Sequence, residues 1–226
     1  AETMHLLLHF DGEGRILGAQ GVGREGVDKR IDVIATATRG GLRVDDLVDL
    51  DLSYAPPFGA AKDPVMMLGM IADNVLSGRL TQHDPVGPLD PETTLVLDVR
   101  NPGEWDRGHI EGAMLVPQPD VAASIEEIRR AAAGRPIVVH CASGFRSYLA
   151  NRTLAGAGID SANVSGGFTT LAIAQPQLVA HPQTSPASAT TSGTTVSSTN
   201  AGRNANPSGS TIATPSLAAA SSISCS

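Results

Sequence analysis

The sequence predicts an α/β fold in which a parallel sheet is flanked by helices, preceded by a partial α+β unit and followed by a disordered tail. A short apolar run at 136–140 is typical of a buried parallel strand. It leads through a tight loop at 141–146 into a helical pattern at 147–155. A buried strand followed by a helix is the repeating unit of α/β folds. The composition changes on either side of this strand, loop and helix, and these changes indicate where the domain begins and ends.

The composition divides the chain into four parts. Residues 1–78 mix apolar and charged positions, and a Gly- and Pro-rich stretch at 79–90 is typical of a linker. Residues 91–175 carry the strand, loop and helix. From 176 to 226 the chain is Ser, Thr, Ala, Pro and Asn with almost no charge, and its low apolar content does not offset the entropy of ordering. We therefore expect a disordered tail, although a glycosylated stalk or an appended terminus would have a similar composition.

Charge and cysteine usage exclude several classes of protein. A net charge of −7 with scattered basic residues makes nucleic acid and anionic membranes poor partners. The chain has no run of about 18 apolar residues, and its first residues lack the basic start and apolar core of a signal peptide. Two cysteines, Cys141 and Cys225, cannot define a disulfide framework, and Cys225 in the tail is not expected to be catalytic. A functional free thiol needs a reducing compartment, so we expect a cytoplasmic protein.

Residues 21–26 fit the pattern G-x-G-x-x-G, which in a nucleotide-binding turn lies between a strand and a helix. A strand-like run at 15–20 precedes it and a helical pattern at 27–35 follows it. The next strand and its ribose-binding acid are missing, because 40–49 is typical of a turn and a short acidic helix. Chance matches also arise easily in a chain with 24 Gly. The sequence therefore argues against dinucleotide binding here.

A further helix is predicted at 64–76. Pro64 suits its first position and Asp63 suits its N-cap. Its apolar residues cover more than one side, and three of the five Met residues of the chain lie on it. This pattern predicts either burial against a partner or the core of a small domain, and the sequence leaves both open.

Cys141 is the candidate nucleophile. It follows the predicted strand and opens a loop whose backbone N–H groups point at a common centre beside a helix N-terminus. Both effects favour the thiolate, which is the form that attacks. Gly144 has no Cβ, so the loop can bend back at this residue. Arg146 adds a positively charged guanidinium, with several N–H donors, near the same centre. A buried structural cysteine would need neither residue, so we predict a loop that holds an anion or an anionic sulfur species.

Several spaced motifs in 91–175 resemble those of the rhodanese family. The active loop Cys141–Arg146 is similar to the family's Cys-x-x-Gly-x-Arg loop. The other motifs are Leu95-Val96-Leu97-Asp98-Val99-Arg100, Glu104-Trp105, Gly108-His109-Ile110-Glu111-Gly112-Ala113, Val116-Pro117 and Val164-Ser165-Gly166-Gly167-Phe168.

This resemblance implies a rhodanese-like fold and a sulfurtransferase. Cys141 would take up a sulfane sulfur as a persulfide and pass it to an acceptor. The resemblance also implies which residues bind the substrate, namely Ala142, Ser143, Gly144, Phe145 and Arg146. The expected partners are small sulfur donors and thiol acceptors, such as thiosulfate, persulfides and coenzyme A persulfide.

Loop length separates this interpretation from its nearest rival. Cysteine phosphatases resemble His-Cys-x5-Arg, with room for the oxygens of a phosphate. Only four residues lie between Cys141 and Arg146. The tighter loop suits a single extra sulfur atom, so we expect no meaningful phosphatase activity.

Neighbouring residues are predicted to support the loop, and no metal site is predicted. Asp98 and Arg100 could touch the substrate, but we favour a polar network that props the loop. His109 is assigned a turn-stabilising role, because persulfide transfer needs little base once a thiolate exists. His140 alternates with the nucleophile along the strand, so its side chain is expected on the other face. Trp105 is interpreted as a core residue.

The first part of the chain resembles the C-terminal dimerisation domain of pyridine nucleotide-disulfide oxidoreductases. The similar segments are 16–20, 26–32, 51–58 and 61–65. The Tyr-Ala-Pro-Pro and Ala-Lys-Asp-Pro runs are similar to the coenzyme A-disulfide reductase and NADH oxidase branch. The resemblance implies a truncated domain, and it places Tyr54 where the family has a Tyr that reaches the active site of the partner subunit. Phe58 stands where the family often has a second Tyr.

Together the two resemblances imply the C-terminal portion of a coenzyme A-disulfide reductase-type flavoenzyme with a fused rhodanese domain. FAD and NAD(P)H are implied for a homodimeric full-length parent, and no cofactor is expected on this chain itself. The alternative is a non-catalytic assembly or sulfur-binding module of that oxidoreductase.

Overall fold

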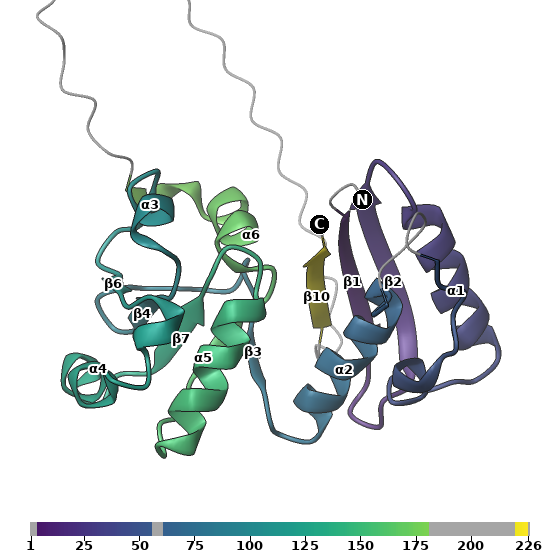
Figure 1. Cartoon of the computed structure of the whole chain (residues 1–226), viewed down its shortest axis with the longest axis horizontal. Helices are drawn as coiled ribbons and strands as arrows, with labels where there is room; N and C mark the ends of the chain where they lie inside the picture. The colour runs from purple at the N-terminus through teal and green to yellow at the C-terminus, as the bar shows by residue number, and fades with distance from the viewer. Residues whose placement is uncertain (1–3, 56–60, 181–219, 226) are drawn as a thin grey trace, which may run out of the picture.

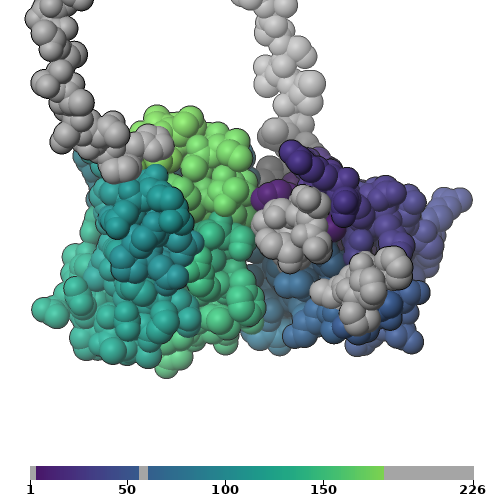
Figure 2. Space-filling view, turned by 45° about the horizontal axis from the view of Figure 1, so that its top comes forward, coloured from purple at the N-terminus to yellow at the C-terminus, as the bar shows by residue number. Residues whose placement is uncertain are grey.

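The computed structural model describes residues 4–55, 61–180 and 220–225, which form two units that lie side by side (Figure 1). The first unit holds a three-stranded antiparallel sheet with two helices, and the second holds a five-stranded parallel sheet flanked by helices. The space-filling view shows each unit as a separate lobe (Figure 2). The predicted fold class is therefore confirmed.

The N-terminal sheet is built around a hairpin of β1 (Met4–Phe10) and β2 (Ile16–Gly23). Alternate residues of β1 are buried, and they face α1 (Val27–Arg39), the 3-10 helix η1 (Asp46–Asp49) and α2 (Pro64–Leu76). This side of the sheet is apolar because the strand alternates with a period of two. The core contains Met4, Leu6, Leu8, Phe10, Ile34, Leu47 and Leu68.

The glycine motif at 21–26 belongs to this hairpin. β2 runs antiparallel to β1, and Gly26 is the left-handed residue, at φ +70°, that precedes α1. A dinucleotide turn needs a parallel strand on the far side of the helix. The structure therefore agrees with the argument against nucleotide binding at this motif.

Asp63 joins the two helices of this unit. One of its carboxylate oxygens accepts the backbone N–H of Val65 at 3.0 Å, which is the predicted N-cap. The other accepts the Arg30 guanidinium at 2.7 Å, and both side chains are less than one-fifth exposed. The cap of α2 is thus also the partner of a largely buried cation on α1.

The second unit has the strand order β3-β8-β7-β4-β6, with all neighbours parallel. Its strands are β3 (Thr81–His83), β4 (Leu95–Asp98), β6 (Met114–Leu115), β7 (Ile137–His140) and β8 (Ala162–Val164). The helices are α3 (Pro102–Trp105), α4 (Ile125–Ala132), α5 (Phe145–Gly156) and α6 (Gly167–Ala174), with a 3-10 turn, η2 (Gln118–Asp120).

The parallel sheet is covered on both faces, and every residue of β4 and β7 is buried. Leu97 and Val139 pack with Ile128 of α4 and Leu154 of α5 on one face. Val96 and Val138 pack with Leu171 of α6 on the other. The carboxyl ends of the strands remain for the loops, which in open parallel sheets is where ligands bind.

The structure differs from the predicted linker at 79–90. Residues 81–83 form β3, the edge strand of the parallel sheet, paired with β8. A strand of three residues is too short to show a periodic pattern in the sequence. Its hydrogen bonds come from the neighbouring β8, which lies far away along the chain. The connection between the units is therefore shorter than predicted.

The predicted tail at 176–226 also differs at both of its ends, while 181–219 and 226 lie outside the described residues. Residues 176–180 form a 3-10 turn, η3 (Pro176–Leu178), and β9 (Val179–Ala180), which pairs antiparallel with β5 (His109–Ile110). Residues 220–225 form β10 (Ala220–Cys225), antiparallel to β1 in the register Met4 with Cys225. The free edge of β1 presents unpaired N–H and C=O groups that an added strand satisfies.

Replacing Asp63 should destabilise the N-terminal unit in particular. Asp63→Ala leaves the Arg30 cation without its carboxylate and removes the cap of α2, so we expect a loss of about 2–4 kcal/mol in the free energy of unfolding. Urea unfolding followed by far-UV circular dichroism measures this loss. Trp105 is the only Trp and lies in the second unit, so its fluorescence reports the unfolding of that unit separately. The urea midpoint measured by this fluorescence should stay unchanged in Asp63→Ala.

Asp73→Ala is the matched control, because the ion pair of Asp73 with Arg79 is about half exposed. Exposed pairs contribute about 0–1 kcal/mol, so this variant should unfold close to the wild type. Equal losses for the two variants would contradict the role assigned to the Asp63 carboxylate.

Candidate active site

Cys141 follows β7 directly, at the carboxyl edge of the sheet, and its side chain is buried, with the residue 1% exposed. The loop after it is shorter than predicted, because α5 begins at Phe145 and not at Ser147. Gly144 ends the loop with φ +111°, in the region that only glycine adopts readily. The sulfur therefore lies between the end of a central strand and the first turn of a 12-residue helix.

The sulfur accepts a hydrogen bond from the protein backbone. The N–H of Gly144 lies 3.1 Å from Cys141 Sγ. The hydroxyl of Ser147 lies 3.4 Å from the same sulfur and 3.1 Å from the Gly144 carbonyl, and its single proton can serve only one of them at a time. Donors directed at Sγ stabilise negative charge on it, so the geometry suits an anionic sulfur.

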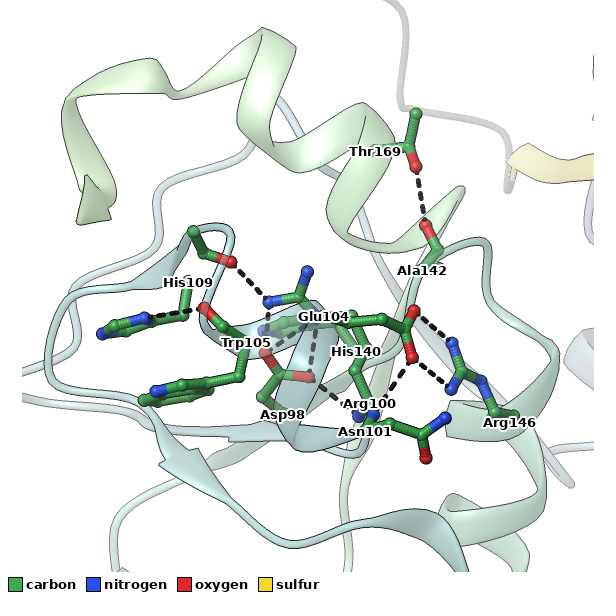
Figure 3. Close-up of polar contacts among 11 residues, drawn as sticks. Asp98, Arg100, Asn101, Glu104, Trp105, His109, His140, Ala142, Arg146 and Thr169 are labelled. Atoms are coloured by element: carbon green, nitrogen blue, oxygen red, sulfur yellow. Dashed lines mark hydrogen bonds and ion pairs between the residues drawn. The ribbon is translucent and has the colours of Figure 1, made fainter. Parts of the chain in front are cut away.

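Arg146 lies in the first turn of α5, but its guanidinium is not a free cation. It donates two hydrogen bonds, at 2.7 and 2.8 Å, to the carboxylate of Glu104 (Figure 3). Glu104 also accepts the backbone N–H of Asn101 at 3.0 Å. The Arg146 partner lowers the pKa of Glu104 to about 2. The pKa of Arg146 is raised, mainly by Glu104 and to a smaller extent by the nearby Cys141 side chain.

Asp98 and Arg100 form a buried ion pair below the loop. The guanidinium donates to both Asp98 oxygens, with the closest contact at 2.7 Å, and the residues are 0% and 4% exposed. Arg100 also donates to the Gly108 carbonyl at 2.8 Å, and it lies 3.8 Å above the ring centre of Phe168. Such burial keeps both residues from a substrate and agrees with the predicted supporting network.

His140 points to the face opposite Cys141, as its alternation predicts. Its ring stacks near Phe168 at 5.7 Å between ring centres, and it lies 3.8 Å from the Asp98 carboxylate. Neither ring nitrogen has a hydrogen-bond partner within the described part of the chain. Burial lowers the pKa of His140 to about 4, an effect that the Asp98 charge only partly offsets, so the ring is neutral near pH 7.

The interpretation of Trp105 as a core residue was wrong. Trp105 is half-buried at the surface of α3, where its ring stacks on His109 at 3.7 Å with an interplanar angle of 6°. The His109 ring nitrogen Nδ1 also lies 3.3 Å from the Trp105 carbonyl. His109 is thus held within the turn, which agrees with the stabilising role predicted for it.

The remaining predicted residues are divided between the two units. Ala142 and Ser143 are half-buried in the loop, and Phe145 is exposed at 62%. Tyr54 lies in the N-terminal unit, where it lines a cavity of about 290 Å³ together with Lys29 and other residues. The structure does not bring Tyr54 to the Cys141 loop, and Phe58 lies outside the described residues.

The sequence analysis missed several contacts to the loop, among them Glu104 on Arg146, Ser147 at the sulfur, and Thr169 of α6 on the Ala142 carbonyl. The signal for Glu104 was present, since Asn101 and Glu104 have the spacing of a capping box before a short helix. Ser147 and Thr169 carry no such signal. Their contacts depend on how α5 and α6 meet the loop in space.

Comparison with known proteins finds a match that includes this site. Residues 84–173 match the family described as "Rhodanese-like domain". A coenzyme A disulfide reductase from Staphylococcus aureus (strain bovine RF122 / ET3-1) is 46% identical over 67 residues, which are 29% of this chain and 15% of that protein.

Two solved structures are similar over most of the chain. The crystal structure of reduced Bacillus anthracis CoADR-RHD has a TM-score of 0.73 and 35% identity, covering 80% of this chain and 35% of its own. A NAD-dependent persulfide reductase from A. fulgidus has a TM-score of 0.64 and 37% identity, covering 74% of this chain and 30% of its own. At 80% coverage, the first similarity extends well beyond residues 84–173.

The chain therefore contains a rhodanese-like domain at 84–173 and is similar to coenzyme A disulfide reductases over part of its length. It spans only about 15% of the length of the curated relatives it matches. Within 4–55, 61–180 and 220–225, no helix has the length and apolar character to cross a membrane. The same residues hold no cluster of three or more His, Cys, Asp or Glu side chains that fits a metal ion.

Acid should destabilise the second unit through His140. Its pKa is about 4 in the folded protein against 6.5 for an unperturbed His, so protonation favours the unfolded chain. The free energy of unfolding should be constant above about pH 7 and fall by at most about 3 kcal/mol as the pH drops from 6.5 to 4. His140→Leu should remove most of this decline and leave the part that comes from His83, whose pKa is also lowered by burial, as measured by urea unfolding with Trp105 fluorescence.

Glu104→Gln provides the matched control, because the Glu104 carboxylate acts in a lower pH window. Its pKa of about 2 lies below the usual 4.5, so its contribution is present above pH 4.5 and is lost between pH 4.5 and 2. This variant should keep the decline between pH 6.5 and 4. An unchanged decline in His140→Leu would show that another group causes it.

Proposed function

We propose that this chain is a rhodanese-type sulfurtransferase that carries sulfane sulfur as a persulfide of Cys141. The observation that carries the proposal is the hydrogen bond from the Gly144 backbone N–H to Cys141 Sγ, in a loop between a strand end and a helix N-terminus. The rhodanese-like domain supports it, because the domain contains the whole loop.

The reaction has two half-steps. The Cys141 thiolate attacks the outer sulfur of a sulfane donor such as thiosulfate, a sulfur–sulfur bond forms on the enzyme, and the donor's sulfur–sulfur bond breaks to release sulfite. An acceptor thiolate or cyanide then attacks the outer sulfur of the enzyme persulfide. The Cys141 thiolate leaves, and the acceptor keeps the sulfur as a persulfide or as thiocyanate. Both half-steps move a sulfane sulfur atom from one nucleophile to another, so no external oxidant or reductant is consumed.

The loop suits this cargo better than a phosphate. Only four residues separate Cys141 from Arg146, and Gly144 already donates to Sγ across the loop. Ala142, Ser143, Gly144, Phe145 and Arg146 line the proposed binding site, and the Arg146 charge is moderated by Glu104. A moderated cation attracts an anionic donor such as thiosulfate without holding the persulfide too firmly for release.

We further propose that the chain is the C-terminal portion of a FAD- and NAD(P)H-dependent coenzyme A-disulfide or persulfide reductase. The similarity to the Bacillus anthracis CoADR-RHD structure supports this, since it includes residues of the N-terminal unit. The N-terminal unit would then be part of a homodimerisation domain with Tyr54 directed at a partner. The glycine motif at 21–26 lies in an antiparallel hairpin and does not fit a dinucleotide, so the cofactors belong to other parts of the parent. A persulfide carrier also needs a reducing compartment, which favours the cytoplasm.

Sulfur transfer should depend on Cys141 and not on Cys225. Cys141→Ser should reduce thiocyanate formation from thiosulfate and cyanide by at least about 1,000-fold, because the serine hydroxyl is not ionised at neutral pH. Intact-mass spectrometry after thiosulfate treatment should show one added sulfur atom on the wild type and none on this variant.

Cys225→Ser is the control and should retain both activities. Uptake of sulfur without transfer to cyanide or any thiol would favour the alternative of a sulfur-binding module. A wild type that gains no sulfur from any sulfane donor would refute the proposed function.

Arg146 and Glu104 should affect the KM for thiosulfate in opposite directions. Arg146→Ala removes the cation that faces an anionic donor, so KM should rise about tenfold. Glu104→Gln leaves the Arg146 charge without its counter-ion, so KM should fall about two- to fivefold. Steady-state kinetics at low ionic strength measure both changes. If both variants raise KM, the carboxylate acts by orienting Arg146 and not by moderating its charge.

A further inference from the structure

The first turn of α6 lies directly on the active loop. The backbone N–H of Phe168 donates to the Cys141 carbonyl at 2.7 Å, and that of Thr169 donates to the Ala142 carbonyl at 3.1 Å. The Thr169 hydroxyl donates to the same Ala142 carbonyl at 3.0 Å (Figure 3). Two successive carbonyls of the loop are therefore held by an element that begins 25 residues further along the chain.

This contact is close enough to exclude a side chain at its centre. Gly167 has φ +64°, and a Cβ added there would lie 2.6 Å from the Cys141 carbonyl oxygen and 2.7 Å from the Ala142 carbonyl carbon. The helix and the loop thus meet backbone to backbone. Because no Cβ separates them, a small change in the turn of α6 is transmitted to the loop.

Holding the carbonyls also orients the N–H groups. A peptide unit is planar and trans, so its N–H points away from its C=O. With the Ala142 carbonyl fixed on α6, the N–H of Ser143 is directed to the opposite side of the loop. The N–H of Gly144, the next one along, already donates to Cys141 Sγ.

We propose that Thr169 is a positioning residue for Cys141. By fixing the Ala142 carbonyl, its hydroxyl holds the Ala142–Ser143 peptide unit with the N–H towards the sulfur and towards the extra sulfur atom that Cys141 carries. This inference deepens the proposed function and rests on it, since the N–H groups of the loop would stabilise the negative charge of a Cys141 persulfide. Thr169 itself does not touch the reacting atoms.

The first turn of α6 is itself held in place by packing of Phe168, so it can fix the position of the loop. The Phe168 ring lies under the Arg100 guanidinium at 3.8 Å and beside the His140 ring. Arg100 is in turn held by the buried Asp98 carboxylate. The Thr169 side chain, in contrast, is exposed, so its hydroxyl can be removed without opening this packing.

The experiment compares three variants in a Cys225→Ser background, in which Cys141 is the only thiol. Thr169→Val removes the hydroxyl and keeps the shape, Thr169→Ser keeps the hydroxyl, and Thr170→Val removes a neighbouring hydroxyl that bonds the Gly166 carbonyl of its own helix. The readouts are the ultraviolet absorbance of the Cys141 thiolate at neutral pH, its rate of alkylation by iodoacetamide, and thiosulfate–cyanide transferase activity.

We expect Thr169→Val to lower the thiolate absorbance and the alkylation rate about two- to fivefold, which is the effect of one partly solvated hydrogen bond. Thr169→Ser should stay within about twofold of the background, and Thr170→Val should be unchanged. If Thr169→Val has the same thiolate absorbance and alkylation rate as the background, the proposal is overturned. An equal decrease in Thr170→Val would also overturn it, since any weakening of α6 would then suffice.

The thiolate readouts separate this proposal from the sulfurtransferase assignment. If the background protein transfers sulfur and Thr169→Val keeps full thiolate character, only the positioning role fails. If no variant transfers sulfur but the contrast between Thr169→Val and Thr169→Ser remains, the positioning of the thiolate stands and the proposed function fails.

Discussion

The buried ion pair of Asp98 and Arg100 is the interaction around which the site is arranged. Both side chains are withdrawn from water, so each charge is stabilised by the other and by the hydrogen bonds that replace its hydration. Arg100 extends this arrangement to the Gly108 carbonyl and to the Phe168 ring. One pair at the end of β4 thereby fixes the turn before β5 and the start of α6.

A chain of contacts links this ion pair to Cys141 Sγ. Phe168 holds the turn of α6, this turn holds the carbonyls of Cys141 and Ala142, and the loop then directs the Gly144 N–H at Sγ. The positive charge of Arg146 is balanced by Glu104, so the sulfur meets a backbone dipole, the Gly144 N–H, rather than a free cation. Such dipoles are fixed by the fold and need no rearrangement when charge develops.

The N-terminal unit shows how far a sequence pattern reaches. The strand β2, both helices and the cap at Asp63 follow from local patterns and capping signals, and they lie close to where the sequence predicts them, whereas β1 and its hairpin with β2 were not predicted. The edge strand β3 and the pairing of β10 with β1 were not predicted. Each is a short segment whose hydrogen bonds come from a strand distant in sequence, and local composition does not encode such a partner.

The sequence alone predicted the candidate nucleophile, the loop that surrounds it and the fold class, because these depend on residue types at fixed short spacings: a cysteine after an apolar run, a glycine three residues on and an arginine five residues on. Only the tertiary structure decided which groups stand opposite that loop. Glu104, Phe168 and Thr169 reach it from α3 and α6, over separations of more than 20 residues. Contacts of that range are set by how helices pack on the two faces of the sheet, and no local period in the chain records them.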